Sequence, residues 1–381
     1  MAFEHYIQSG GQRLCCGYTT GTCAALAAAG AAQLLLSGKA PAALSLMTPK
    51  GLRVTVEPEY CRLVGEIAFC AVRKDGGDDA DATDGAQIEA RVTRTQQPGI
   101  VIDGGPGVGR VTQPGLDQPV GAAAINRVPR QMIEQEVLSV CRANGCEGGL
   151  HVEICVPGGE ELAKKTFNPQ LGIQGGVSIL GTSGIVEPMS TQALIDTVAL
   201  ALRQARAQGS RRVVLTPGNY GEAFLQEGGV ELGQMPVVKC SNFIGDALDE
   251  AAVLGFQDVL LVGHAGKLIK LAGGIMNTHS RWADCRTELF CAHAAICGAS
   301  RQICCELMQA ATVDRCIELL DAAQLRGPVL GSLLQAVEDH LLRRAAGAYR
   351  VGAVLFTNQY GLLGQTSTAQ AIRNDWEETK Q

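Results

Sequence analysis

Residues 258–280 read DVLLVGHAGKLIKLAGGIMNTHS, and this stretch decides the predicted fold of the second half of the chain. Residues 258–262 have the apolar character and length of a short buried strand. Two similar runs, RRVVLTP and MPVVKC, come earlier, and segments with helical periodicity separate the three. Short apolar strands that alternate with helices indicate a parallel sheet. We therefore predict a Rossmann-like α/β domain from residue 191 onward, with Gly263 and His264 at the carboxyl edge where ligands bind.

The rest of this half extends the same domain. A helical insertion is expected over residues 281–344, interrupted at the segment RGPVLGS. The run RVGAVLFTN predicts one last strand, and a polar tail follows it. We assign residues 191–381 to this domain.

The first half has a different pattern. The segment GYTTGTCAALAAAGAAQLLLSG has threonines at its start, strong helix formers through its centre and a glycine at its end, which is typical of a capped helix. Strand-like runs follow at residues 52–57, 65–72, 87–93 and 150–156. We therefore predict an α+β domain over residues 1–190.

The composition excludes several classes of protein. The 381 residues are 46% hydrophobic and 18% charged, so a sizeable core is expected. A net charge of −6 gives no basic surface for nucleic acid or for an anionic membrane. No secretory signal or span of roughly 20 apolar residues is found, so we expect a cytoplasmic protein. None of the 15 cysteines has C-x-x-C spacing, and we predict buried thiols and no bound metal.

The segment PGNYGE follows a predicted strand that ends at Thr216. Its glycines would let backbone amides approach a ligand, and Glu222 would accept a hydrogen bond from a ribose hydroxyl. A plain glycine turn between a strand and a helix explains the same spacing. The predicted cofactor contacts are Thr216, Gly218, Asn219, Gly221 and Glu222.

The opening stretch contains a Gly-Lys pair, but it is no phosphate-binding P-loop. Leu261 stands where that motif needs glycine, and Leu268 stands where it needs serine or threonine. Lys267 and Lys270 are three residues apart and would share a helical face. Such a basic set suits carboxylate ligands, although a solvated helix face is the alternative. The flanking polar residues are His264, Asn277, His279 and Arg281.

Further candidate contacts lie in the first domain. Three threonines, Thr19, Thr20 and Thr22, stand at the start of the predicted helix, where free amides favour an anion, although N-capping alone accounts for one of them. Lys164 and Lys165 precede a glycine-threonine loop that would line a cleft or serve as a connector. The segment KDGGDDADATDG lacks the final glutamate of an EF-hand loop, so a hydrogen-bonded turn is favoured over a metal site.

Together these segments resemble the CbiD family, the cobalt-precorrin-5B C1-methyltransferases of anaerobic cobalamin biosynthesis. The resemblance covers residues 15–365, with Arg127 standing where the family pattern has proline. It implies methyl transfer from S-adenosylmethionine to C1 of a cobalt tetrapyrrole, which gives cobalt-precorrin-6A. The matching segments are GYTTGTCAA, KDGGDDADATDG, GVGRVTQPGL, AINRVPRQMI, LAKKTFNPQLGIQGGVSILGTSGIVEPMS, TPGNYGE and GHAGKLIKLAGGIMNTHS.

The resemblance implies that the basic residues bind the substrate, because a cobalt-precorrin carries many carboxylates. If the reaction uses a protein base, His264 or His279 is the candidate. No nucleic-acid or membrane partner is expected, and a homo-oligomer is left open. Two other functions stay open: an NAD(P)-dependent precorrin reductase and a non-enzymatic tetrapyrrole carrier. The reductase lacks its fingerprint, since Cys240 and Ser241 follow the strand that should end in an acidic residue.

Overall fold

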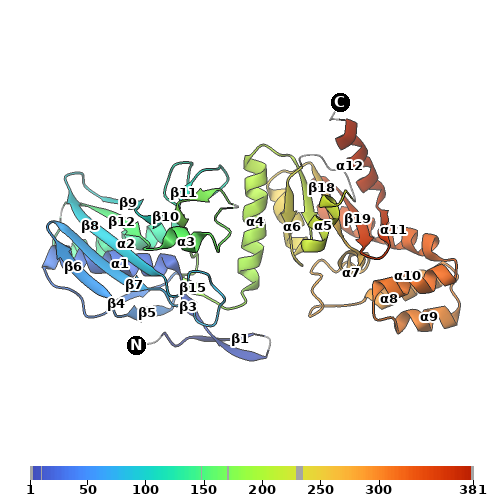
Figure 1. Ribbon diagram of the computed structural model, residues 1–381, viewed down its shortest axis with the longest axis horizontal. Coiled ribbons are helices and arrows are strands. Elements are labelled where there is room, and N and C mark those ends of the chain that lie inside the picture. Colours follow the sequence, from blue (N-terminus) through green and yellow to red (C-terminus); the bar gives the residue numbers. More distant parts are fainter. Residues whose placement is uncertain (1–2, 10, 147, 170, 229–234, 379–381) are drawn as a thin grey trace. The chain divides into compact units, whose positions relative to one another are not determined.

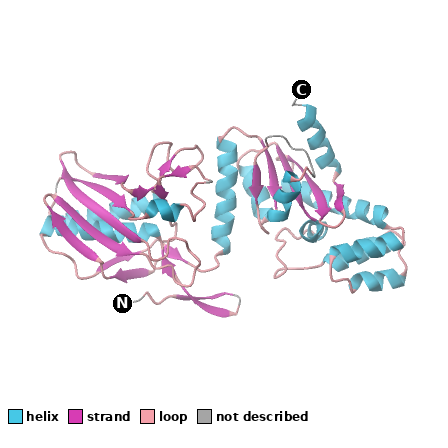
Figure 2. Cartoon of the chain, viewed as in Figure 1, coloured by secondary structure: helices cyan, strands magenta, loops and turns pink. Residues whose placement is uncertain are grey.

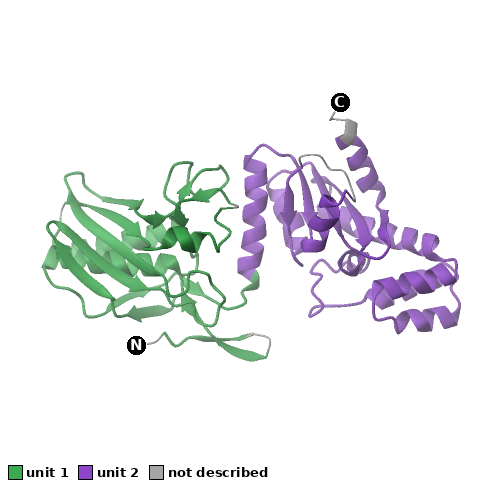
Figure 3. Cartoon of the chain, in the orientation of Figure 1, with its two compact units in different colours: residues 1–191 green, residues 192–381 purple. Residues whose placement is uncertain are grey.

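A computed structural model describes residues 3–9, 11–146, 148–169, 171–228 and 235–378. The chain forms two compact units, residues 1–191 and residues 192–381 (Figures 1 and 3). Both units mix helices and strands, so the predicted mixed α/β class is confirmed (Figure 2).

Unit 1 is built around a five-stranded sheet with the order β6-β7-β8-β12-β9. Neighbouring strands are antiparallel except β12 and β9, which are parallel. The strands of this sheet are β6 (Tyr60–Val64), β7 (Ile67–Arg73), β8 (Gln87–Thr95), β9 (Ile100–Gly104) and β12 (Gly149–Cys155). Shorter strands pair outside it: β1 (Tyr6–Ser9), β2 (Gln12–Cys15), β3 (Gly17–Tyr18), β4 (Leu44–Met47), β5 (Arg53–Val56), β10 (Gly107–Val108), β11 (Arg110–Val111), β13 (Ile173–Gln174), β14 (Gly176–Val177) and β15 (Ile185–Val186).

Helix α1 (Thr20–Ser37) packs against this sheet and against α2 (Arg127–Ala143), while α3 (Gly159–Ala163) lies by β14. Thr19 caps the start of α1, and Gly38 ends it in the left-handed conformation. Small side chains let α1 approach closely, because a Cβ atom at Gly30 would lie 2.6 Å from the sulfur of Cys70 in β7. Among the described helices, α1 alone has the length and composition of a membrane span, and 72% of it is buried inside the protein, as in a core helix.

Unit 2 has a five-stranded sheet with the order β17-β16-β18-β19-β20. The first four strands are parallel, and β20 is antiparallel. The strands are β16 (Arg212–Thr216), β17 (Val237–Lys239), β18 (Asp258–His264), β19 (Arg350–Thr357) and β20 (Gly361–Gln365). Counted along the chain, the order is 2-1-3-4-5, one of the two common orders of doubly wound sheets. The order reverses at β16 and β18, so the loops after these two strands open on one crevice.

Helices cover both faces of this sheet (Figure 1). Alternate residues of each strand point to opposite sides, so Val213 and Leu261 join one core cluster while Val214 and Val262 join another. The first cluster includes α4 (Thr191–Ala207), α6 (Ile244–Val253) and α11 (Arg326–Ala345). The second includes α5 (Asn219–Gln226) and α12 (Ser367–Glu378). The remaining helices are α7 (Ala265–Leu268), η1 (Ile269–Gly273), α8 (Arg286–Ile296), α9 (Arg301–Met308) and α10 (Val313–Ala322).

Two predictions about this half are wrong. The segment RGPVLGS does not interrupt a helix but begins α11, because proline is tolerated in the first turn, where its missing N–H has no helical partner. The expected polar tail forms β20 and α12 instead. Ile372 and Trp376 of α12 are buried against the sheet, which explains why this polar segment folds.

Candidate functional site

The loops after β16 and β18 touch at the carboxyl edge of the sheet in unit 2. The Nζ atom of Lys267 in α7 donates a hydrogen bond to the carbonyl oxygen of Pro217. A Cβ atom at Gly263 would lie 2.7 Å from Cγ of Pro217, so the two loops pack with no room for a side chain. The structure therefore joins the two segments that the sequence analysis singled out, PGNYGE and GHAGK.

The start of α5 forms a close-packed cradle between these loops. Gly218 has φ 138° and ψ −177°, a conformation that is essentially restricted to glycine. A Cβ atom at Gly221 would lie 2.8 Å from the carbonyl oxygen of Val262. The buried Oγ1 atom of Thr216 has no hydrogen-bond partner among the described residues. A backbone that approaches closely and an unpartnered hydroxyl are features of a ligand site.

Two other predicted cofactor contacts stand on the same helix. Asn219 is the first residue of α5 and is exposed. Glu222 lies in the first turn, and its Oε2 atom pairs with Nζ of Lys239 at 2.7 Å. The carboxylate therefore already has a cationic partner from β17, and its contact with a ribose stays a prediction.

His264 ends β18 and caps α7. Its Nδ1 atom accepts a hydrogen bond from the Gly266 amide at 3.0 Å. Since that nitrogen must hold a lone pair, the ring is neutral and carries its proton on Nε2. Burial lowers the pKa of His264 below its ordinary value, while the charge of Asp314 opposes the shift and that of Arg286 adds to it. His264 is thus a hydrogen-bond donor through Nε2 at neutral pH.

The two lysines lie on either side of the change from α7 to the 3-10 helix η1, and their ammonium groups have different hydrogen-bond partners. Lys270 is only 3% exposed, and its Nζ atom donates to the carbonyl oxygens of Thr278 at 3.0 Å and Ala283 at 2.8 Å. Burial lowers the pKa of both lysines. Lys270 therefore holds the segment after η1 in place, whereas Lys267 reaches the cradle.

The other predicted contacts of this stretch lie on the segment that Lys270 anchors. Asn277 pairs with Phe243, and its Oδ1 atom accepts a hydrogen bond from the His279 amide at 3.2 Å. The Nδ1 atom of His279 accepts from the Arg281 amide at 3.0 Å, which repeats the arrangement at His264. His279 and Arg281 are exposed and available to a ligand.

In unit 1 the three threonines bind the loop that contains Gly181 and Gly184. The Oγ1 atom of Thr22 donates to the Gly184 carbonyl oxygen at 2.6 Å, and that of Thr20 accepts from the Leu180 amide at 2.9 Å. Thr19 caps α1 by accepting from the Thr22 amide at 3.2 Å. All three side chains are buried and have protein partners. Their contact with a ligand stays a prediction, while their structural role is to join the two glycine-threonine segments.

Two further segments of unit 1 differ in exposure. Lys164 and Lys165 are exposed after α3, and Nζ of Lys164 pairs with Glu161 at 2.6 Å. The aspartates of residues 75–84 accept hydrogen bonds from within their own turn and from the amide of Cys15. Asp81 pairs with the buried Lys74 at 2.6 Å. Among the described residues, no three acidic, histidine or cysteine side chains gather to hold a metal ion.

The sequence analysis missed a cleft of about 450 Å³ between α5 and the β19–β20 turn, which we call the α5–β19 cleft. Tyr220 and Phe224 line it from α5, and Phe356 and Asn358 line it from the end of β19. One feature of the sequence could have indicated this cleft: Asn358 comes directly after a predicted strand, at the edge where ligands of parallel sheets bind.

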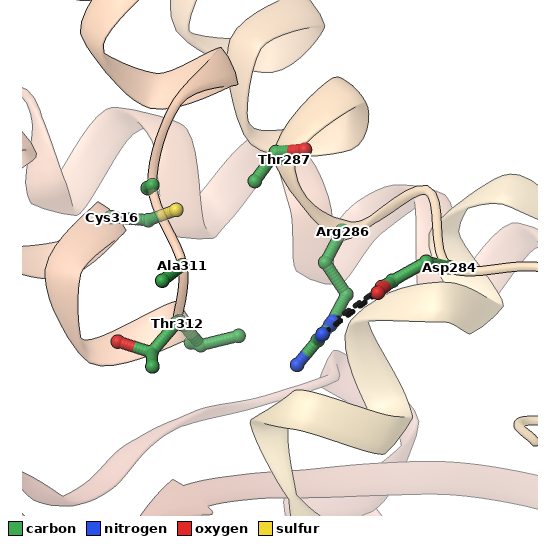
Figure 4. Close-up of a pocket in the computed structure, with 8 residues that line it drawn as sticks. Asp284, Arg286, Thr287, Ala311, Thr312 and Cys316 are labelled. Atoms are coloured by element: carbon green, nitrogen blue, oxygen red, sulfur yellow. Dashed lines mark hydrogen bonds and ion pairs between the residues drawn. The ribbon is translucent and has the colours of Figure 1, made fainter. Parts of the chain in front are cut away.

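A smaller pocket of about 120 Å³ lies among the helices that follow (Figure 4). Arg286 lines one side, and the carboxylate of Asp284 holds its guanidinium through bonds of 2.5 and 2.8 Å. Thr312 and Cys316 face it from the start of α10. Neither Arg286 nor Asp284 was singled out from the sequence.

Known proteins resemble this chain along almost all of its length. The sequence model of the CbiD family matches residues 7–188, and the model described as CbiD, C-terminal domain, matches residues 277–367. A protein of Ruminiclostridium cellulolyticum named cobalt-precorrin-5B C(1)-methyltransferase is 47% identical, over 93% of this chain and 92% of its own. A protein of Edwardsiella ictaluri with the same name is 41% identical over 98% of each chain. A crystal structure of cobalamin biosynthesis protein CbiD from Archaeoglobus fulgidus is 30% identical, covers 72% of this chain and 86% of its own, and has a TM-score of 0.40.

Proposed function

The chain belongs to the CbiD family, and on that premise we propose that it transfers a methyl group to C1 of cobalt-precorrin-5B, as a step of cobalamin biosynthesis. The observation that carries the proposal is the 47% identity to a relative with that name over 93% of the chain. S-adenosylmethionine is the proposed methyl donor. We class unit 2 as Rossmann-like in the broad sense, on the basis of its four parallel strands and helices on both faces.

The residues at the carboxyl edge suit this donor. There is open space beside Gly218, since a Cβ atom there would meet only Nζ of Lys267, at 3.5 Å, and the buried Thr216 hydroxyl has no partner among the described residues. The Lys267 ammonium is half-buried beside Gly218 and suits a carboxylate such as that of the methionine group. When bound, S-adenosylmethionine supplies an electrophilic methyl group on its sulfonium. Asn219 and Glu222 complete the proposed cofactor set.

The chain's own part in the reaction is then to position and desolvate the reactants. His264 and His279, the proposed catalytic residues, both use Nδ1 to accept an amide N–H. With Nδ1 used as an acceptor, each ring has its Nε2–H available to donate. We propose that they act as hydrogen-bond donors to substrate oxygens.

Cations and amides at the surface are the proposed contacts for the substrate's carboxylates. Lys267, which the sequence analysis gave to these carboxylates, is assigned here to the methyl donor. Arg281 in unit 2 and, independently of it, Lys164 and Lys165 in unit 1 stay predicted substrate contacts. Asn277 and Lys270 support the loop that carries Arg281, and the three threonines support the loop after β14.

The test is to incubate the purified protein with cobalt-precorrin-5B and S-adenosylmethionine labelled in its methyl group. We expect label in the tetrapyrrole at C1 and stoichiometric S-adenosylhomocysteine. Tetrapyrrole binding without transfer of label would identify a carrier and reject the proposal. Oxidation of NADPH with the same substrate, again without label transfer, would identify a reductase.

A further inference from the structure

The α5–β19 cleft has the size and position of a small-molecule site. Its volume of about 450 Å³ falls within the range of about 300–1,000 Å³ that is usual for such sites. It opens at the carboxyl end of β19, on the side of the sheet covered by α5. Tyr220, in the middle of PGNYGE, lines the cleft, so this site begins where the cradle ends.

Aromatic rings form the wall of the cleft. Phe224 of α5 stacks on Phe356 of β19, with ring centroids 4.0 Å apart and an interplanar angle of 1°. The His264 ring meets Phe356 edge-on at 5.8 Å, and Tyr220 lies 6.0 Å from His264. Tyr220 is 64% exposed, although a large aromatic side chain is favourable when buried. Its exposed ring provides a flat surface on which a planar heterocycle can stack.

Three polar groups at the cleft have no hydrogen-bond partner among the described residues: the Tyr220 hydroxyl, the Glu227 carboxylate and the Asn358 side-chain amide. An asparagine amide can both donate to and accept from one edge of adenine. A carboxylate accepts hydrogen bonds from ribose hydroxyls. A flat apolar wall with these groups around it therefore matches a purine nucleoside.

We propose that the α5–β19 cleft binds the adenosyl group of the methyl donor, with Tyr220 stacking on adenine, Asn358 binding its edge and Glu227 binding the ribose. The proposal rests on the proposed function. It places recognition of the adenine base in the α5–β19 cleft and not at Thr216, Gly218 and Gly221. The methionine group then extends from the cleft along Tyr220 to Gly218 and Lys267. A tetrapyrrole macrocycle with its acid side chains is excluded as the occupant because it is larger than a cleft of about 450 Å³.

The test is titration calorimetry of the full chain with S-adenosylhomocysteine. We expect Tyr220→Ala and Asn358→Ala each to weaken binding by about tenfold or more, because each removes a contact with the base. S-inosylhomocysteine presents an altered base edge, so the preference of the wild type for the adenosyl compound should shrink in Asn358→Ala. Gln359→Ala and Gln226→Ala are matched controls, since both residues are exposed neighbours outside the cleft lining.

The outcomes separate the cleft from the function. If the wild type binds S-adenosylhomocysteine and transfers methyl groups, but both cleft variants bind as tightly as the controls, the cleft assignment is wrong and the function stands. A wild type that neither binds the compound nor transfers a methyl group overturns both. Equal weakening in the control and cleft variants would also reject the cleft, because it would indicate a general effect on folding.

Discussion

The Nδ1 atom of His264 accepts a hydrogen bond from the Gly266 amide at 3.0 Å, so this histidine caps a helix at the centre of the proposed site. An asparagine at this position can accept the same hydrogen bond through its side-chain oxygen, whereas an alanine cannot. We therefore expect His264→Asn to retain methyl transfer within about tenfold. His264→Ala should lose about 1 kcal/mol of stability and the geometry of the Lys267 loop. Steady-state assays at saturating substrate, with urea denaturation alongside, measure both effects. A folded His264→Asn variant with no turnover would contradict this account, because asparagine can both cap the helix and donate a hydrogen bond.

The same histidine should make stability depend on pH. Burial lowers its pKa in the folded protein, so the unfolded chain binds the proton more readily. Its contribution to stability is therefore present above the ordinary histidine pKa, about 6.5, and is lost as the pH falls through the folded pKa. Burial lowers the pKa of His293 in the same direction. We expect the free energy of unfolding to fall between pH 7.5 and pH 5.5 less steeply in His264→Asn than in the wild type. A double variant with His293→Gln should flatten it further, and an unchanged slope in both would contradict this account.

Gly218 should be more sensitive to substitution than its surroundings suggest. A Cβ atom there would meet only Nζ of Lys267, at 3.5 Å, which is ordinary contact. The cost arises instead from φ 138° and ψ −177°, where a non-glycine residue loses about 1–3 kcal/mol. We expect Gly218→Ala to displace the loop and weaken S-adenosylhomocysteine binding in calorimetry, and Gly218→Val to weaken it more. Gly331→Ala, in helix α11 with open space around it, should bind as the wild type does. If Gly218→Val binds S-adenosylhomocysteine as tightly as the wild type, the assignment of Gly218 to the cofactor site is wrong.

The carboxyl edge could be predicted from the sequence because its signals are local. Short apolar runs such as residues 212–216 and 258–262 predicted β16 and β18, and the glycines after them marked the loops that meet in the structure. The position of Asn358 was not recognised because it depends on the pairing of β18, which ends at His264, with β19, which begins only at Arg350. Contact between Phe356 and α5 is a property of the sheet order, which no local pattern contains.

The lysines show a second limit of sequence patterns. Spacing of three residues predicts neighbouring side chains in either kind of helix, but it does not predict burial, and Lys270 is 3% exposed whereas Lys267 is half-buried. The polar C-terminal segment shows a third limit. Its apolar residues are few, but Ile372 and Trp376 fall on the side of α12 that faces the sheet. The overall polarity of this segment therefore led to the prediction of a tail, although the segment forms a helix that covers part of the core.

The threonines of unit 1 should contribute to stability in proportion to their hydrogen bonds. Thr22 is fully buried, and its hydroxyl donates to the Gly184 carbonyl oxygen at 2.6 Å. Thr22→Val removes this hydrogen bond but leaves the carbonyl its second donor, the Thr19 amide at 3.1 Å, so we expect a cost of about 0.5–1.5 kcal/mol in the free energy of unfolding. Thr22→Ser keeps the hydroxyl and should cost less. The matched control is Thr55→Val, since that hydroxyl pairs with Ser45 on an exposed face of the strand. Chemical denaturation followed by circular dichroism provides the comparison, and equal values for Thr22→Val and Thr55→Val would contradict the buried role.

Trp376 should be essential to the stability of unit 2, although it lies near the end of the chain. Its indole N–H donates to the Oδ2 atom of Asp258 at 3.0 Å, and Nε of Arg350 donates to the Oδ1 atom of the same buried carboxylate at 2.7 Å. Trp376→Ala should cost about 3–5 kcal/mol of stability, because it opens a cavity and removes a donor from a buried charge. Trp376→Phe fills most of the cavity and should cost about half as much. The second tryptophan, Trp282, is 70% exposed, so Trp282→Ala should change stability by less than about 0.5 kcal/mol. Urea denaturation followed by circular dichroism distinguishes the three variants, and a Trp376→Ala protein as stable as Trp282→Ala would mean that α12 does not hold the sheet.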